Sequence, residues 1–360
     1  MPKKNAKKLP FVSICTPTFN RRPFIPYMLK CFEHQTYPKE RMEWIIIDDG
    51  TDKIEDLISE VKQIKYFKYD NKLTLGKKRN IMHEKSCGDI IVYMDDDDYY
   101  PPERVSHAVE MLSKNPNALC AGSSIMNIFF KHVGEMYQFG PYGPNHATAA
   151  TFAFKRELLK RTSYDESACL AEERHFLKDY TIPFVQLDTM KTILVLSHVH
   201  NSFDKKIILE QGENQFMRKT NVRVEDFIKN KDIYNFFMED IDKILEIYEP
   251  GKPENKMDVL NQLKEIKAKR EAMMIEQQKQ FQQNSRIDDS KMEIKLLKEK
   301  TVYLENKITK LIKEMIGLKK ELQEAKKPAL EKESEIERPA LEKESEIERH
   351  EYKETSNTNM

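Results

Sequence analysis

Four consecutive aspartates, Asp95 to Asp98, follow the apolar run IIVYM at residues 90–94. Two unit charges about 4 Å apart interact by about 4 kcal/mol at an effective dielectric near 20, so such a cluster is costly without a counterion. On an extended backbone alternate side chains share a face, so we expect Asp95 and Asp97 to point together and Asp96 to point away. This D-x-D spacing predicts a site where two carboxylates hold Mg²⁺ or Mn²⁺ and leave open positions for substrate phosphates.

Three other interpretations of the aspartate run are weaker. An EF-hand loop that begins at Asp95 needs glycine at position 100 and glutamate at position 106, where Tyr100 and Ser106 stand. Asp98 in part serves the next helix, because the following Pro-Pro-Glu is typical of a helix start. A solvated acidic turn is disfavoured because a buried strand precedes it.

Apolar and amphipathic stretches alternate in the first half of the chain. Strands are expected at 11–16, 43–49, 65–70 and 89–94, helices at 22–35, 54–62 and 75–86, and further strands at 184–187 and 192–198. This order predicts an α/β fold with a mostly parallel sheet and helices on both faces, which binds ligands at the carboxyl ends of its strands. Polar residues gather at those ends, in TPTFN at 16–20, DDG at 48–50 and the aspartate run. A dinucleotide fingerprint and a P-loop are both absent from the sequence.

Composition and charge exclude several classes of protein. Sixty basic residues balance sixty acidic ones, so the chain should not attract nucleic acid or an anionic membrane. No window approaches the about 20 apolar residues of a membrane span. Five cysteines without CxxC spacing suit reduced thiols in a cytosol and argue against a zinc site. We therefore expect a cytoplasmic protein with no membrane span and no nucleic-acid partner.

The C-terminal third has the pattern of a coiled coil. Apolar residues step by three and four from Ile287 for about five heptads. Position a holds Ile287, Ile294, Thr301, Ile308, Met315 and Leu322, and position d holds Ser290, Leu297, Leu304, Leu311 and Leu318. Largely β-branched residues at a with leucine at d favour a parallel two-stranded coil, so a parallel homodimer is predicted. The alternative is a lone, solvated amphipathic helix.

These patterns divide the chain into four expected parts. They are a basic flexible tail at 1–9, an α/β domain with a helical C-terminal part at 10–249, a helical region with the coiled coil at 254–326 (heptads from 287), and a charged low-complexity tail at 327–360. The tail contains the unit PALEKESEIER twice, at 328–338 and 339–349. A proline at the start of each unit is expected to interrupt a continuous helix.

Five segments together resemble the family 2 type of glycosyltransferases with the GT-A fold. They are FVSICTPTFNRR, EWIIIDDGTD, LGKKRN, VYMDDDDYYPP and AEERHFL, which occur in this order between residue 9 and about residue 205. The resemblance implies a Rossmann-like GT-A fold and a metal-dependent, inverting transfer of one sugar from a nucleotide sugar, a UDP-sugar, to a hydroxyl of a saccharide or protein acceptor. The QxxRW motif of processive synthases is missing, which favours transfer of a single sugar.

The resemblance also implies roles for individual residues. The nucleotide would be held by Thr16, Pro17, Thr18, Asn20, Asp48 or Asp49, Lys77, Asn80 and Asp96. The metal, Mn²⁺ or Mg²⁺, would be held on the diphosphate by Asp95 and Asp97, with Asp98. Glu173 is the expected catalytic base and Glu172 the second choice, where the family more often has Glu-Asp. His198 and His200 are expected to share a strand face and, with Lys205, to reach the metal or the diphosphate.

Two rival functions fit part of the pattern. A sugar-nucleotide pyrophosphorylase shares the sheet topology and the use of a metal, but it carries a glycine-rich GxGxR loop where this chain has TPTFNRR. The other rival is a coiled-coil scaffold with a catalytically inactive nucleotide-sugar-binding domain. Against it, no acidic residue of the motif set is missing from the chain.

Overall fold

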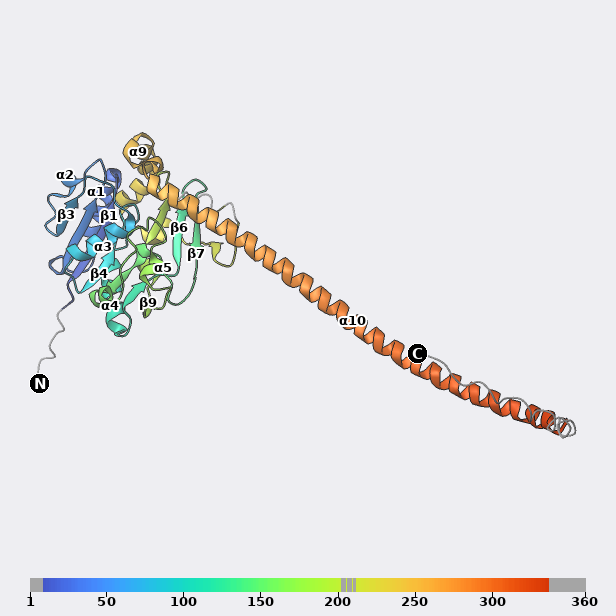
Figure 1. Ribbon diagram of the computed structural model, residues 1–360. Coiled ribbons are helices and arrows are strands. Elements are labelled where there is room, and N and C mark those ends of the chain that lie inside the picture. Colours follow the sequence, from blue (N-terminus) through green and yellow to red (C-terminus); the bar gives the residue numbers. More distant parts are fainter. Residues whose placement is uncertain (1–8, 202–204, 206–208, 210–211, 337–360) are drawn as a thin grey trace, which may run out of the picture. The chain divides into compact units, whose positions relative to one another are not determined.

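The computed structural model of the chain describes residues 9–201, 205, 209 and 212–336. The chain divides into two compact units, Met1–Lys269 and Arg270–Met360 (Figure 1). The basic tail expected at 1–9 lies outside the described residues except for Leu9. Among the described helices, none combines the length and the hydrophobicity that a bilayer crossing needs.

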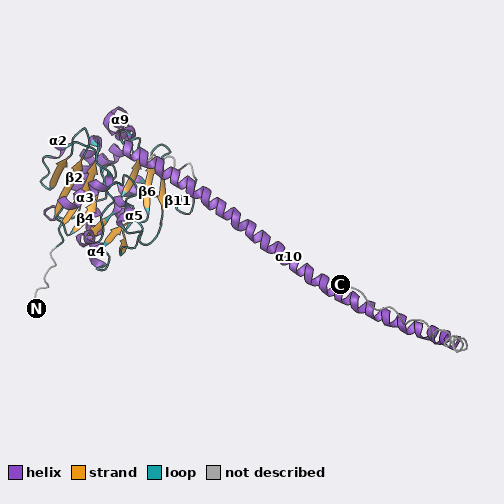
Figure 2. Cartoon of the chain, viewed as in Figure 1, coloured by secondary structure: helices purple, strands orange, loops and turns teal. Residues whose placement is uncertain are grey.

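A seven-stranded sheet forms the centre of the first unit (Figure 2). Its order is β3-β2-β1-β4-β8-β5-β9. The strands are β1 Val12–Thr18, β2 Met42–Asp48, β3 Ile64–Lys68, β4 Ile90–Tyr93, β5 Cys120–Gly122, β8 Ala153–Lys155 and β9 Phe184–Gln186. Within this sheet, as far as the structure describes it, β8 alone runs antiparallel to its neighbours. The prediction of a mostly parallel sheet is therefore confirmed.

Helices cover both faces of the sheet because its central strands are apolar on both sides. Ile14 and Ile46 face one core, where α1 and α4 pack, and Cys15 and Ile47 face a second core, where α3 packs. The helices of this part are α1 Ile25–Glu33, α2 Glu55–Ile58, α3 Leu75–Lys85, α4 Arg104–Lys114 and α5 Glu173–Phe176. Alternate residues of β1 and β2 thus supply two separate cores, as expected for buried parallel strands.

A second, four-stranded sheet has the order β10-β6-β7-β11. Its strands are β6 Met126–Phe130, β7 Glu135–Phe139, β10 Leu194–Ser197 and β11 Met217–Lys219. Sequence analysis predicted only β10 of this sheet. Two backbone hydrogen bonds of 2.9 and 3.1 Å join Tyr99 to Leu194. This bridge places the end of the aspartate run beside the start of β10.

The C-terminal part of the described chain is helical. Its helices are α7 Val224–Phe227, α8 Lys231–Asn235, α9 Ile241–Ile247 and α10 Met257–Ile336. The first unit ends at Lys269, so it includes the first turns of α10 and extends beyond the boundary expected at residue 249. Helix α10 contains Pro328, and the expected interruption at the first repeat is therefore wrong. One lost donor is outweighed there by strong helix formers such as alanine, leucine, glutamate and lysine. The second repeat, at 339–349, lies outside the described residues, as do the last two residues of the first repeat.

Candidate active site

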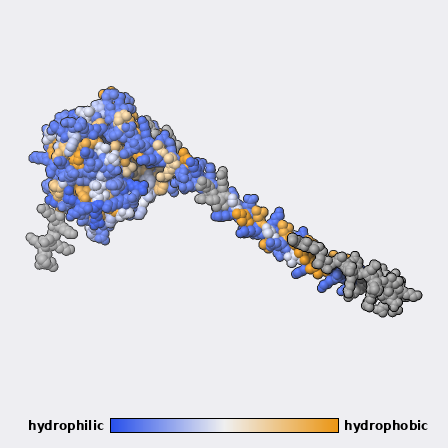
Figure 3. All heavy atoms as spheres, viewed as in Figure 1, coloured by the Kyte–Doolittle hydropathy of each residue, from blue (hydrophilic) through white to orange (hydrophobic). Residues whose placement is uncertain are grey.

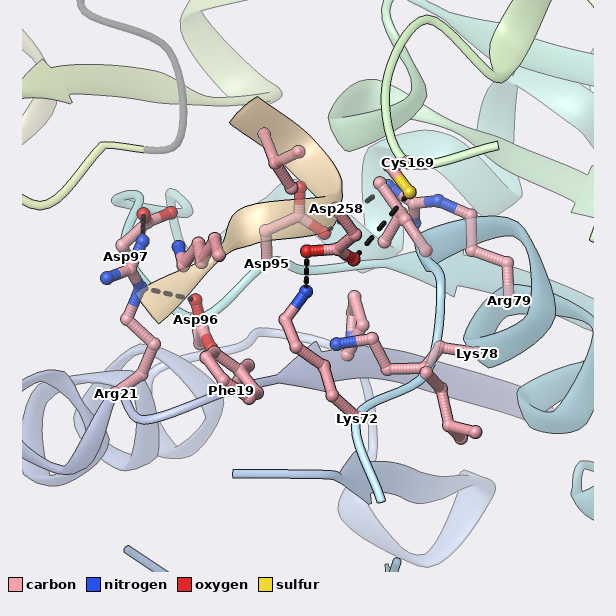
Figure 4. Close-up of a pocket in the computed structure, with 15 residues that line it drawn as sticks. Phe19, Arg21, Lys72, Lys78, Arg79, Asp95, Asp96, Asp97, Cys169 and Asp258 are labelled. Carbon is pink, nitrogen blue, oxygen red and sulfur yellow. Dashed lines mark hydrogen bonds and ion pairs between the residues drawn. The ribbon is translucent and has the colours of Figure 1, made fainter. Parts of the chain in front are cut away.

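A cavity of about 160 Å³ lies where β1 and β4 end (Figure 4). Asp95, Asp96 and Asp97 all line it. The expectation that Asp96 points away is wrong, because the extended strand ends at Tyr93 and the backbone bends through the aspartate run. Asp98 does not line the cavity. Burial and the nearby charge of Asp97 raise the pKa of its carboxyl.

Arg21 lies close to two of these carboxylates. Its Nη2 lies 3.2 Å from Asp97 Oδ2, and its Nε lies 3.7 Å from Asp96 Oδ1. Burial and the neighbouring charge of Asp97 raise the pKa of Asp96 to about 7. Burial opposes the ionisation of Asp97, but Arg21 and His198 outweigh it and hold the pKa of this carboxyl below its usual range. The two neighbouring acids are therefore driven in opposite directions.

Arg79 joins the aspartate run to the acidic pair at 172–173. Its Nε donates to Glu172 Oε1 at 2.8 Å, and its Nη2 lies 3.8 Å from Asp95 Oδ1. The guanidinium is buried and lies 4.4 Å from the centre of the Tyr93 ring. Because Arg79 comes from α3 and Asp95 follows β4, this one side chain connects three separate elements.

Glu173 differs from Glu172 although the two are adjacent. Glu172 is buried and bonded to Arg79, whereas Glu173 is only partly buried at the start of α5. Burial and the charge of Glu172 raise the pKa of Glu173 to about 7. A carboxyl with such a pKa is suited to accept a proton at neutral pH.

Another side of the cavity contains a buried ion pair. Lys78 Nζ lies 2.8 Å from Asp49 Oδ1, and the second oxygen of Asp49 accepts from Leu73 N at 2.6 Å. Lys77, which sequence analysis selected, is exposed and does not line the cavity. Successive residues on a helix are rotated by about 100°, so the neighbouring lysine reaches the interior instead.

Asp48 and Asn20 hold the loops around this side of the cavity. Asp48 accepts from Gly50 N at 2.9 Å, Ile54 N at 3.2 Å and the Tyr66 hydroxyl at 2.6 Å. The side-chain oxygen of Asn20, a residue with φ of +53°, accepts two backbone N–H groups at 2.7 and 3.0 Å. Both side chains are therefore engaged within the protein.

Four further residues that were predicted to bind the nucleotide have different surroundings. Thr16 donates to Met94 O at 2.6 Å and accepts from the Trp44 indole at 2.8 Å. Asn80 pairs with the backbone of Tyr164 through two bonds of 3.0 Å. Pro17 lines the cavity, and Thr18 is buried at the end of β1.

The two predicted histidines do not share a strand face, because β10 ends at Ser197 and both lie in the following turn. His198 Nε2 lies 3.3 Å from Asp97 Oδ2, and burial lowers its pKa to about 4. His200 instead offers its backbone carbonyl to Arg21 Nη2 at 2.8 Å. The charge of Lys205 acts on both Asp97 and Asp98 and favours their ionised forms.

The residues fit a divalent cation whose coordination would be completed by oxygen atoms of a bound ligand. In the described part of the chain, no group of three or more His, Cys, Asp or Glu side chains could enclose an ion. Magnesium sites on phosphate substrates need only one or two carboxylates, because phosphate and water oxygens supply the rest. Asp95 suits this role: its buried Oδ1 accepts no hydrogen bond from any described residue, and burial raises its pKa.

The sequence pattern did not predict the cationic walls of the cavity. Arg21, Lys72 and Arg79 line it together with Asp258 (Figure 4). Lys256 lines it as well. Arg21 and Arg79 lie inside quoted motifs, TPTFNRR and LGKKRN, which was the available signal. For Lys256 the sequence offered none, since it lies beyond the boundary expected for the α/β domain.

Comparison with known proteins gives a family match for part of the chain. Residues 13–163 match the model of glycosyl transferase family 2. The poly(ribitol-phosphate) beta-N-acetylglucosaminyltransferase TarS of Staphylococcus aureus is 24% identical over 236 residues, which cover 60% of this chain and 38% of that protein. The probable glycosyltransferase YdaM of Bacillus subtilis is 31% identical over 116 residues, or 29% of this chain and 26% of that protein. The matched region thus spans well under half the length of these relatives.

Solved structures give weaker likenesses. A crystal structure of S. aureus TarS 1–349 has a TM-score of 0.40 at 18% identity, covering 52% of this chain and 60% of that chain. The mannosyltransferase PcManGT from Pyrobaculum calidifontis, in complex with GDP-Man and Mn²⁺, has a TM-score of 0.42 at 16% identity, covering 52% of this chain and 57% of that chain.

Proposed function

We propose that this chain, whose residues 13–163 belong to glycosyl transferase family 2 and form part of an α/β fold of the GT-A type, is a metal-dependent inverting glycosyltransferase. In this proposal it moves a single sugar from a nucleotide sugar, a UDP-sugar, to a hydroxyl of a saccharide or protein acceptor. The observation that carries the proposal is the link through Arg79, which holds Glu172 at 2.8 Å and Asp95 at 3.8 Å. The guanidinium of Arg79 therefore links the acidic pair at 172–173 to the candidate metal site at Asp95.

Glu173 is the proposed catalytic base. Its pKa of about 7 leaves a substantial fraction deprotonated at neutral pH, and it is less buried than Glu172. Glu172 is already bonded to Arg79, so we assign it the role of positioning Arg79 and of raising the pKa of its neighbour. The two adjacent carboxylates thus have different tasks because their surroundings differ.

The reaction follows from these groups. The carboxylate of Glu173 takes the proton of the acceptor hydroxyl while the hydroxyl oxygen forms a bond to the anomeric carbon. The bond between that carbon and the diphosphate oxygen breaks on the opposite face, and the diphosphate leaves with the electron pair. A divalent cation on Asp95 and Asp97 would act as a Lewis acid that stabilises the charge on the leaving diphosphate. Arg21 and Arg79 keep the two carboxylates in place.

The donor nucleotide is proposed to lie along Pro17, Phe19 and the ion pair of Asp49 with Lys78. Phe19 presents a ring in the cavity, with Lys72 Nζ at 4.9 Å and Lys78 Nζ at 5.9 Å from its centre. The loops around the nucleotide would be held in place by side chains that bond within the protein, those of Thr16, Asn20, Asp48 and Asn80. TarS is named as a beta-N-acetylglucosaminyltransferase, which supports inversion at an α-linked donor.

The second unit supports the proposal of a parallel homodimer. Its helix exposes the heptad residues from Ile294 onward, with more than two fifths of each apolar side chain accessible (Figure 3). They are Ile294, Leu297, Leu304, Ile308, Leu311, Met315, Leu318 and Leu322. A second copy of the same helix is the partner that the sequence favours. Three charge pairs flanking the seam would be opposite in sign, whereas one would repel. They are Glu293 with Lys298, Lys300 with Glu305 and Glu314 with Lys319, against Arg286 with Lys291.

The test compares Glu173→Gln with Glu172→Gln. Each variant and the wild type receive UDP-N-acetylglucosamine, UDP-glucose or GDP-mannose with Mn²⁺, and nucleotide release is followed with and without saccharide acceptors. Glu173→Gln should still bind UDP and should lose about 10²- to 10⁴-fold in transfer, the usual cost of removing a positioned base. Wild-type transfer by Glu173→Gln would refute its role, and no turnover of any donor by the wild type would refute the function.

A further inference from the structure

The chain from Pro250 to Gln262 lies against the donor cavity. Lys256, Asp258 and Val259 line the cavity together with Asp96 and Asp97. Lys256 is only 6% exposed. Burial and the charge of Arg21 lower its pKa to about 7, while the charges of Asp97 and Asp96 favour its charged form. In Figure 4 the start of α10 passes between the side of the cavity with Asp97 and the side with Cys169.

Contacts on one side fix this segment to the base-bearing loop. Asp258 forms an ion pair with Lys72 and accepts a hydrogen bond from Cys169 Sγ at 3.6 Å. Gln262 Oε1 accepts from Cys169 N at 2.8 Å and from Leu170 N at 2.7 Å. These two backbone groups directly precede the Ala-Glu-Glu turn, so α10 holds the loop that carries the proposed base.

Contacts on the other side fix the same segment to the end of β1. Asn20 Nδ2 donates to Pro250 O at 2.9 Å, and Arg21 Nη1 donates to Gly251 O at 3.4 Å. A Cβ at Gly251 would lie 2.7 Å from His200 Nδ1 and 2.8 Å from Asn20 O, so only glycine allows this approach. The segment is therefore anchored at both ends of the cavity, with Lys256 between the anchors.

We propose that Lys256 contacts the diphosphate of the donor, so that residues 250–262 form a wall of the donor site and are not a linker. This inference rests on the proposed function. A ligand in a cavity of about 160 Å³ touches most of its walls, and Lys256 is the cation that this wall supplies. A lysine beside metal-binding carboxylates can neutralise phosphate oxygens that the ion does not reach. Lys256 lies outside residues 13–163, so the family match does not assign it.

The experiment measures binding of UDP, UMP and uridine to the full chain with Mn²⁺ by calorimetry. Lys256→Met should weaken UDP binding by about 10- to 100-fold, the effect of losing one hydrogen bond to a charged group. It should change UMP and uridine binding much less, and Lys256→Arg should restore much of the UDP affinity. Lys264→Met, a change of an exposed lysine two turns further along α10, is the matched control and should bind UDP as the wild type does.

The fluorescence of Trp44, the single tryptophan, monitors the fold of the first unit in each variant. Unchanged UDP affinity in a folded Lys256→Met protein would overturn the inference and leave the proposed function intact. Equal weakening of UDP, UMP and uridine without rescue by arginine would also overturn it, since that result describes a structural lysine. Absence of UDP binding by the wild type would overturn the proposed UDP donor itself, and the inference with it.

Discussion

Replacement of Arg79 by methionine should destabilise the first unit strongly. The Arg79–Glu172 pair is 2.8 Å long, and the side chains are only 3% and 5% exposed. Removing one partner of a buried ion pair leaves an uncompensated charge and costs about 3–5 kcal/mol. For a domain of this size, that loss corresponds to a fall in Tm of about 6 to 20 °C.

Urea and thermal unfolding followed by Trp44 fluorescence report this change, because Trp44 is fully buried in the first unit. Arg174→Met is the control, since the Arg174–Asp179 pair of 2.6 Å is 72% exposed on both sides and should contribute about 0–1 kcal/mol. The double variant Arg79→Met/Glu172→Gln should be more stable than Arg79→Met alone, because it leaves no unpaired buried carboxylate at position 172.

Arg79→Met should also change the pH dependence of any remaining activity. The charge of Arg79 lowers the pKa of Glu173, against the larger effects of burial and Glu172. Without it the pKa rises, and since a base acts when deprotonated, the acidic limb of kcat/KM should move to higher pH. If Arg79→Met is as stable as Arg174→Met, or the double variant is no better than the single one, the role assigned to Arg79 is wrong.

Four further outcomes are expected. The double change Asp95→Asn/Asp97→Asn should abolish Mn²⁺-stimulated release of UDP from a UDP-sugar, and unchanged stimulation would reject the metal role. The kcat/KM of the wild type should rise through a pKa of about 7, that of Glu173, and a rise near pH 4 would contradict the raised value. Burial raises the pKa of Asp96 to about 7, so its stabilising contribution is complete only below the unfolded-state pKa of about 4 and is lost as pH rises from there through 7; Asp96→Asn should therefore raise Tm relative to the wild type by more at pH 8 than at pH 5, and an equal gain at both would contradict the raised value. Light scattering should find the full chain at twice the mass of one chain and a chain ending at Lys269 as a monomer, whereas a monomeric full chain would refute the coiled coil.

The sequence predicted the first four strands of the sheet because β1, β2 and β4 are largely apolar runs and amphipathic helical stretches separate the four strands. It predicted neither β5 to β8 nor the second sheet as a unit. Strands β6 and β7 are partly exposed and β5 and β8 have three residues each, so neither length nor alternation marked them. Pairing between Tyr99 and Leu194 joins residues far apart in the chain, and sequence periodicity contains no information about such contacts.

The sequence predicted the acidic residues of the candidate site but not its basic residues. A run of aspartates behind a strand is conspicuous, whereas a buried lysine or arginine has the same letter as a solvated one. Helix α3 buries Lys78 and Arg79 along with apolar residues, so hydropathy gave no sign of which face points inward. Lys256 enters the cavity from a segment that composition assigned to the helical region, and only the tertiary contacts of Asp258 and Gln262 reveal it.

In the proposed mechanism, the aspartate run and a diphosphate together complete a divalent-cation site. The electron paramagnetic resonance signal of free Mn²⁺ measures this directly when the full chain is titrated with the ion in the presence and absence of UDP. We expect weak loss of the free signal without UDP and tight, one-to-one loss that requires both protein and UDP. A signal that UDP and protein together reduce no further than UDP alone would contradict it.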